Sequence, residues 1–172
     1  MTDAALAPLA DALLSAAAKA GADAADVLVT NSTSLSIDVL NGTLEQAERS
    51  EGIDLGLRVM VGQRQACVSA SDASPDTLLE MADRAVTMAK LAPEDPFIGL
   101  ADADALSEVR DGAALDMADP NTDPDPASLE EMALQAEAAA LTFEGISQVA
   151  QAGAGFMRRQ IHLAASNGFS GG

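Results

Sequence analysis

The chain has one histidine and one cysteine, the side chains that most often carry metal or nucleophilic chemistry. A protein zinc site needs three or four histidine, cysteine or carboxylate ligands, and His162 and Cys67 alone give no such set. A catalytic thiol needs a histidine as its base, and none is near Cys67 in the sequence. We therefore predict no catalytic residue and no metal ligand in this segment. His162 is expected to be a structural or surface residue, and Cys67 a small buried side chain.

Acidic side chains are numerous, but their spacing does not indicate catalysis. Glu45 and Glu48 point to opposite faces of a predicted strand, so they cannot form an acid–base pair. The acidic run from Glu94 to Glu131 lacks the ligand spacing of a calcium loop. Such charges usually stay hydrated. We interpret the first set as a solvated strand edge and the second as a surface connection.

The composition argues against several classes of function. The formal net charge of −18 repels polyanions, so we predict no nucleic-acid binding. No apolar run is long enough to span a membrane, and the N-terminus lacks the basic region of a signal peptide. Because the single Cys67 cannot form an internal disulfide, we expect a reducing, cytoplasmic location.

The segment from Val27 to Ala70 has the pattern of an antiparallel β-meander. Asn41-Gly42 is a strong two-residue hairpin signal, because both residues tolerate positive φ. A second turn is predicted at Gly62-Gln63, and it sets Val61 opposite Arg64. The register predicted from the two turns is Val59 with Ala66, Leu57 with Val68, Leu55 with Ala70, Val39 with Leu44 and Ile37 with Gln46. The strand Thr43 to Ser50 is mostly polar and therefore predicts an edge.

Helices and further strands are predicted on both sides of the meander. We predict one helix over Asp3 to Ala20 that ends at Gly21, one from Ser74-Pro75 to Ala92, and one from the N-cap Ser128 to Gly145. A helical turn is predicted near Leu100 to Val109, and two further strands are predicted over Ser147 to Ala154 and Met157 to Ala165. This order predicts an α+β fold with a mostly antiparallel sheet and helices packed on one face.

The same pattern predicts three sequence-consecutive regions. Residues 1–92 form an α+β domain of a helix, a four-stranded meander and a helix. Residues 93–127 form an acidic, proline-rich connection. Residues 128–172 supply a helix and two strands, which we expect to continue into residues absent from this chain, since Ser166 to Gly172 reads as a turn leading out of a strand.

Five segments in series resemble one protein family. They are Gly21 to Val27 (GADAADV), Asn41 to Glu51 (NGTLEQAERSE), Gly56 to Ala66 (GLRVMVGQRQA), Ala92 to Pro96 (APEDP) and Ser166 to Gly171 (SNGFSG). No single segment is specific, but five in the right order and spacing are. Together they resemble the N-terminal portion of the PmbA (TldE) type in the TldD/PmbA family of gyrase modulators and metalloproteases.

The resemblance implies a metallopeptidase family in which a TldD-type subunit carries a zinc-binding His-Glu motif on a helix. The PmbA-type subunit shares the fold but lacks that motif, and no segment of this chain matches it. Zinc is therefore expected in the TldD-type partner and no cofactor in this segment. The expected assembly is a heterodimer with that partner, or a homodimer, acting on a peptide substrate.

Two functions follow from the residues and the resemblance together. The first is the N-terminal part of the non-catalytic subunit of a zinc metalloprotease complex, linked to peptide antibiotic maturation, antitoxin degradation and gyrase modulation. In it, the edge at Leu44, Gln46 and Glu48 accepts an extended peptide by β-addition, because an open edge presents unpaired N–H and C=O groups. The alternative is a non-enzymatic module that binds a gyrase-directed toxin or antitoxin.

Overall fold

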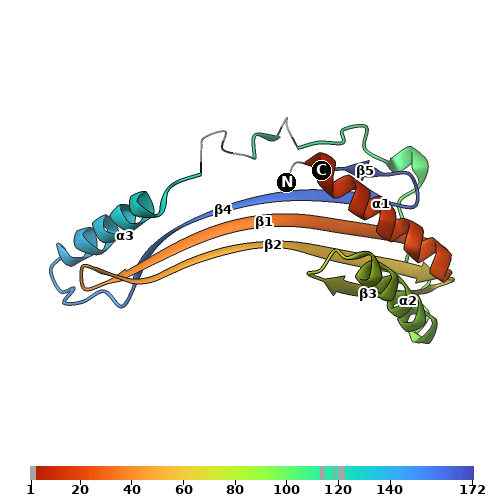
Figure 1. The fold of residues 1–172 in the computed structure, drawn as a ribbon, viewed down its shortest axis with the longest axis horizontal. Helices are drawn as coiled ribbons and strands as arrows, with labels where there is room; N and C mark the ends of the chain where they lie inside the picture. Colours follow the sequence, from red (N-terminus) through yellow and green to blue (C-terminus); the bar gives the residue numbers. More distant parts are fainter. Residues whose placement is uncertain (1–2, 113–114, 118, 120–122) are drawn as a thin grey trace. The chain divides into compact units, whose positions relative to one another are not determined.

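The computed structural model describes residues 3–112, 115–117, 119 and 123–172, and Figure 1 shows the order of their elements. The elements are α1 (Asp3–Ala20), β1 (Ala24–Leu40), β2 (Thr43–Val61), β3 (Arg64–Ala70), α2 (Pro75–Leu91), the 3₁₀ turn η1 (Ala103–Ala105), α3 (Pro126–Leu141), β4 (Ala152–Ala165) and β5 (Ser170–Gly171). The strands form one sheet in the order β3-β2-β1-β4-β5. The predicted α+β fold with an antiparallel sheet is confirmed.

The chain forms two compact units, and each is built from separate stretches of sequence. The first unit contains Met1–Asn31, Gly52–Met117 and Gln160–Gly172, and the second contains Ser32–Glu51 and Ala118–Arg159. Strands β1, β2 and β4 supply residues to both. The domain boundaries predicted at residues 92 and 127 follow the order of the sequence, and they stay a prediction.

The core of the first unit lies between two helices and one face of the sheet. Alternate residues of β1 and β2 are buried there because successive side chains of a strand point to opposite faces. The larger buried side chains of this core are Leu6, Leu13, Val27, Val29, Leu55, Leu57, Val59, Val68, Leu78, Met81 and Val86. Helical periodicity predicts that Leu78, Met81, Ala82, Ala85 and Met88 form the inner face of α2. The first four are buried, whereas Met88 is 45% exposed and Val86 and Ala89 are buried in addition.

Both two-residue turns of the meander are confirmed, as is the register after the second. Asn41, Gly42 and Gly62 have φ values of 54°, 72° and 57°, the left-handed conformation that such hairpin turns require. The β2–β3 pairing is Val61 with Arg64, Val59 with Ala66, Leu57 with Val68 and Leu55 with Ala70. The β1–β2 pairs predicted from the first turn stay a prediction.

The number of meander strands was predicted wrongly. The sequence predicts four, but β2 runs without a break from Thr43 to Val61, so there are three between α1 and α2. Gly52, where a break between two strands is predicted, keeps extended backbone instead, because a glycine without a second turn residue beside it can remain within a strand.

Helix α3 of the second unit begins earlier and turns a different face inward than predicted. Its N-cap is Asp125, whose carboxylate accepts the Ser128 N–H at 2.9 Å, so Ser128 is not the cap. The helix ends at Leu141 rather than at Gly145. Periodicity predicts an inward face that includes Met132, Ala133 and Phe143, but of these only Ala133 is buried, and Met132 and Phe143 are 58% and 66% exposed. The buried residues of α3 are Leu129, Ala133 and Glu137, and the first two pack with Leu35, Ile37 and Val39 of β1.

The two strands predicted near the C-terminus are one strand, β4, from Ala152 to Ala165. The sequence predicts a break near Gly155, but both glycines in this region keep the strand extended. A Cβ at Gly155 would lie 3.3 Å from the Leu35 carbonyl oxygen, and one at Gly153 would lie 3.2 Å from that of Ile37. Glycine therefore allows β4 to approach β1 closely at these two positions.

Candidate functional site

The predicted edge lies on β2, on the flank that faces away from β1. Every residue from Thr43 to Glu51 is exposed, and Leu44 keeps 48% of its surface in solvent. Strand β3 pairs only with Leu55–Val61 of β2, as Figure 1 also shows. In the described part of the chain, no strand therefore pairs with Thr43–Glu51 on that flank.

The direction of the backbone groups at this edge follows from the hairpin turn. In a two-residue hairpin the residues that flank the turn, here Leu40 and Thr43, exchange hydrogen bonds with each other. Because these groups alternate along a strand, we infer that the N–H and C=O groups of Leu44, Gln46 and Glu48 point away from β1, as the predicted pairing of Val39 with Leu44 also requires. These three residues are the ones predicted to bind a peptide.

The side chains along the edge are held by their neighbours on the same strand. Arg49 Nε donates to Glu51 Oε1 at 2.8 Å, and both side chains remain about 60% exposed. Gln46 Nε2 donates to Glu48 Oε2 at 3.5 Å. Both pairs join residues two apart, which share one face of an extended strand. The edge therefore presents ordered polar groups rather than an apolar surface.

The hairpin beside this edge is anchored by Glu137 of α3. The carboxylate accepts the N–H of Asn41 at 2.8 Å and the N–H of Gly42 at 2.7 Å, and the residue is only 4% exposed. Two adjacent N–H groups in left-handed conformation form a small anion-binding concavity. No sequence prediction included Glu137. Its signal in the sequence is its position one turn beyond Ala133 and two turns beyond Leu129, on an otherwise apolar stripe.

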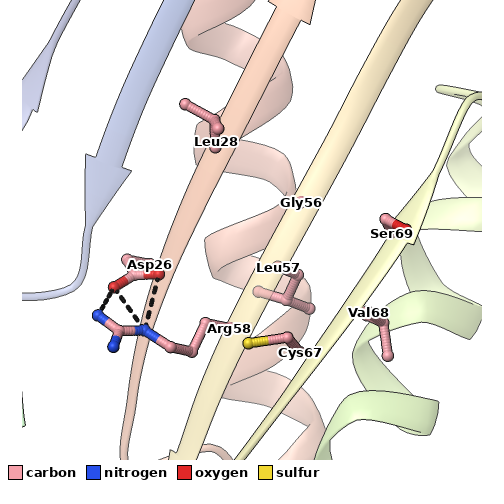
Figure 2. A pocket seen from close by; sticks show the side chains of 8 residues that line it. All are labelled: Asp26, Leu28, Gly56, Leu57, Arg58, Cys67, Val68 and Ser69. Carbon is pink, nitrogen blue, oxygen red and sulfur yellow. Dashed lines mark hydrogen bonds and ion pairs between the residues drawn. The ribbon is translucent and has the colours of Figure 1, made fainter.

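A hollow of about 410 Å³ lies in the first unit, on the sheet face opposite the helices. Its lining residues are Asp26, Leu28, Gly56, Leu57, Arg58, Cys67, Val68 and Ser69. Figure 2 shows Leu28, Cys67 and Ser69 around the bare backbone of Gly56. A Cβ on Gly56 would meet nothing nearer than 3.8 Å, so the hollow exists because this position lacks a side chain, not because the backbone needs glycine.

An ion pair borders the hollow. Arg58 donates from Nε to both carboxylate oxygens of Asp26, at 3.0 and 3.2 Å, and from a terminal nitrogen to the same group. The hydrogen bond to Asp26 raises the pKa of Arg58 above its ordinary value. A second hollow of about 300 Å³, lined partly by Leu100, Leu106 and Leu163, reaches the same two charged residues.

Cys67 and His162 differ from their predicted surroundings. Cys67 lies opposite Arg58, and its side chain is exposed rather than buried as expected. His162 is 5% exposed, and its Nε2 lies 3.0 Å from Ser170 Oγ, which fits the predicted structural role. Ile161 and Leu163, which flank His162 on the opposite face of β4, are 46% and 40% exposed.

The described residues contain no group of three or more histidine, cysteine or carboxylate side chains placed to hold a metal. None of the helices in this part of the chain is both long and apolar enough to cross a membrane. His162 and Cys67 belong to the first unit, and the edge at Thr43–Glu51 belongs to the second.

Comparison with known proteins shows the family. Residues 25–89 match the family model for PmbA/TldA metallopeptidase domain 1. The chain is 36% identical over 126 residues to a metalloprotease PmbA homolog of Haemophilus influenzae, and 32% identical over 120 residues to metalloprotease PmbA of Escherichia coli O157:H7. These alignments cover 73% and 69% of this chain but only 27% and 26% of the relatives, so the chain spans about a quarter of their length.

Two solved structures share the fold. TldE from Thermococcus kodakarensis superposes with a TM-score of 0.75 and 19% identity, over 94% of this chain and 36% of that one. A candidate modulator of DNA gyrase from Bacteroides thetaiotaomicron gives a TM-score of 0.72 and 20% identity, over 95% of this chain and 37% of that one.

The fold and the matched residues thus define the first domain of a metallopeptidase family. The chain belongs to the PmbA/TldD family and corresponds to the N-terminal portion of a PmbA- or TldE-type protein.

Proposed function

We propose that this chain is the N-terminal part of the non-catalytic, PmbA/TldE-type subunit of a zinc metalloprotease complex that acts on peptides. The observation that carries the proposal is the match of residues 25–89 to domain 1 of the PmbA/TldA metallopeptidases. The two curated relatives, both named metalloproteases, support it. In this proposal the partner is a TldD-type subunit, which holds the zinc and cleaves the peptide bond.

The contribution of this chain is to hold an extended peptide along the open flank of β2. The exposed backbone from Thr43 to Glu51 supports this role, because unpaired N–H and C=O groups accept another strand. Main-chain hydrogen bonds then supply the affinity. The anchored hairpin at Asn41 and Gly42 keeps the edge in place before the peptide arrives.

The proposal is tested by reconstitution with a TldD-type subunit and zinc. An unstructured peptide is offered to the partner alone, to the mixture, and to mixtures with two variants of this chain. Gln46→Pro removes an N–H that points away from β1, whereas Gln46→Thr keeps it and serves as the matched control. We expect the mixture to cleave faster than the partner alone, the proline variant to lose the increase, and the threonine variant to keep it.

The alternative function is a non-enzymatic module that binds a gyrase-directed toxin or antitoxin. The structural neighbour described as a candidate modulator of DNA gyrase supports this alternative. The same reconstitution separates the two. Cleavage that never exceeds that of the TldD-type partner alone would favour the module, as would a self-association of this chain that excludes the partner. The cytoplasm is the proposed location for either function, because it maintains the single thiol of Cys67 in its reduced state.

A further inference from the structure

The open edge of β2 carries charges that can discriminate among extended peptides. Between Thr43 and Glu51 the strand has three carboxylates and one guanidinium. Arg49 and Glu51 neutralise each other through their ion pair. Glu45 and Glu48 are exposed, and neither forms an ion pair within the described residues. Two negative charges therefore remain beside the outward backbone groups.

We propose that this edge binds extended peptides that have two basic side chains separated by two residues, and this rests on the proposed peptide-handling function. Glu45 and Glu48 are three positions apart, so they lie on opposite faces of the strand. Residues three apart in an added strand also lie on opposite faces. Each basic side chain of such a peptide therefore lies beside one carboxylate.

The distances in a sheet make these pairs direct contacts. Cross-strand neighbours have Cβ atoms about 4.5–5.5 Å apart, and opposite charges at such positions stabilise the pairing. A peptide with basic residues separated by one residue puts both charges on the same face, where it can meet Glu45 or Glu48 but not both. The spacing of the carboxylates thus selects one arrangement of basic residues over another.

Charge also argues against two other occupants of the edge. An acidic peptide would bring like charges to Glu45 and Glu48 and would meet the formal net charge of −18 of the chain. A second copy of this chain, paired edge to edge, would bring its own Glu45 and Glu48 and the same net charge. A cationic peptide is the occupant that the edge favours electrostatically.

The test measures binding of short labelled peptides to the full chain, without the TldD-type partner, by fluorescence anisotropy at low salt. The peptides share a threonine and valine frame and carry two lysines separated by two residues, two lysines separated by one residue, or glutamines in place of the lysines. The protein variants are the double change Glu45→Gln with Glu48→Gln, and Gln46→Pro with its control Gln46→Thr. Circular dichroism confirms that each variant is folded.

We expect the first peptide to bind about fourfold more tightly than the glutamine peptide, since each exposed cross-strand ion pair contributes a factor of roughly two. The Glu45→Gln and Glu48→Gln double variant should reduce this ratio to about one, and raised salt should do the same. Gln46→Pro should abolish binding of every peptide, and Gln46→Thr should not.

Three outcomes would overturn the inference. Equal affinity for all three peptides, still lost in Gln46→Pro, would show an edge that binds without regard to charge. Binding that survives Gln46→Pro would place the peptide elsewhere. Concentration-dependent dimerisation that Gln46→Pro abolishes would assign the edge to a second copy. Failure of the proposed function has a different signature, because it appears as unchanged cleavage in the reconstituted mixture while the binding results stand.

Discussion

The carboxylate of Glu137 accepts the backbone N–H of Gly42 at 2.7 Å and thereby fixes the β1–β2 hairpin to α3. The second oxygen accepts the N–H of Asn41 at 2.8 Å. Both donors belong to a turn in left-handed conformation, whose N–H groups have no partner in the hairpin itself. A buried carboxylate thus completes the turn that begins the proposed peptide-binding edge.

Glu137→Ala should destabilise the chain by about 1–3 kcal/mol, because two N–H groups lose a charged acceptor inside the fold. Glu137→Gln should cost less, since its amide oxygen can still accept one of the two hydrogen bonds. The free energy of unfolding in urea measures both. Equal stability of Glu137→Ala and the unaltered chain would contradict the anchoring role, and Glu131→Ala, on the exposed side of α3, is the control.

The hydrogen bonds that the Asp72 carboxylate accepts at the start of α2 should stabilise the fold at neutral pH, and this stabilisation should be lost in strong acid. Hydrogen bonds from the hydroxyl of Thr77, then from the hydroxyl and N–H of Ser74, hold the pKa of Asp72 below its ordinary value. A carboxyl group with a lowered folded-state pKa contributes stability above its unfolded pKa and loses it as pH falls through the folded pKa. The contribution should therefore fade below about pH 4.

Asp72→Asn tests this pH dependence. The variant should have a lower melting temperature than the unaltered chain at neutral pH, and the difference should shrink as the pH falls below about 4. Thermal melts followed by circular dichroism across this range supply the measurement. A difference that stays constant with pH would show that the ionised carboxylate is not what matters. Asp76→Asn, in the exposed first turn of α2, is the matched acidic control.

Gly56→Ala should stabilise the chain by about 0.5–1 kcal/mol, because glycine weakens a strand interior and the added methyl group meets no atom within 3.8 Å. Gly171→Ala is the opposite case, since its Cβ would lie 3.0 Å from the carbonyl carbon of Arg110 and even closer to the oxygen. We expect that second change to destabilise. Urea unfolding of both variants checks the signs, and a destabilised Gly56→Ala would show that the hollow needs glycine.

The pair of Asp26 and Arg58 should contribute only modestly to stability. The Arg58 side chain is 38% exposed, so solvent screens its attraction to Asp26 despite the several hydrogen bonds between them. A double-mutant cycle with Asp26→Asn and Arg58→Gln should give a coupling energy of about 0.5–1 kcal/mol. A coupling energy near zero would mean that the contact leaves stability unaffected.

Cys67 should react rapidly with a thiol reagent in the folded chain, because its side chain is exposed on the uncovered sheet face. Quantitative labelling under native conditions, at the rate seen in urea, is the expected result. Labelling that is slow in the folded chain and fast in urea would contradict this exposure. In the folded chain, Gly56→Leu should slow the labelling of Cys67, because the larger side chain fills the neighbouring hollow.

Local structure can be predicted from the amino-acid sequence wherever the decisive forces act between near neighbours. Asn41-Gly42 and Gly62 favour positive φ whatever surrounds them, so the turns and the β2–β3 register followed directly. Ser74 and Pro75 marked the start of α2 for the same reason, since a cap and an N1 proline act within one helical turn. The family resemblance also belonged to the sequence, because it depends on residues in order.

Tertiary packing determines which faces are buried and which polar groups are in contact. Alternation places Ile161 and Leu163 on one side of β4, but packing alone made the side with His162 the buried one. In α3 the inward face was set by contact with β1, which put Glu137 inside and Met132 outside. The Glu137–Gly42 contact joins residues 95 positions apart. Periodicity shows which residues share a face, whereas the choice of face depends on what the rest of the chain brings against it.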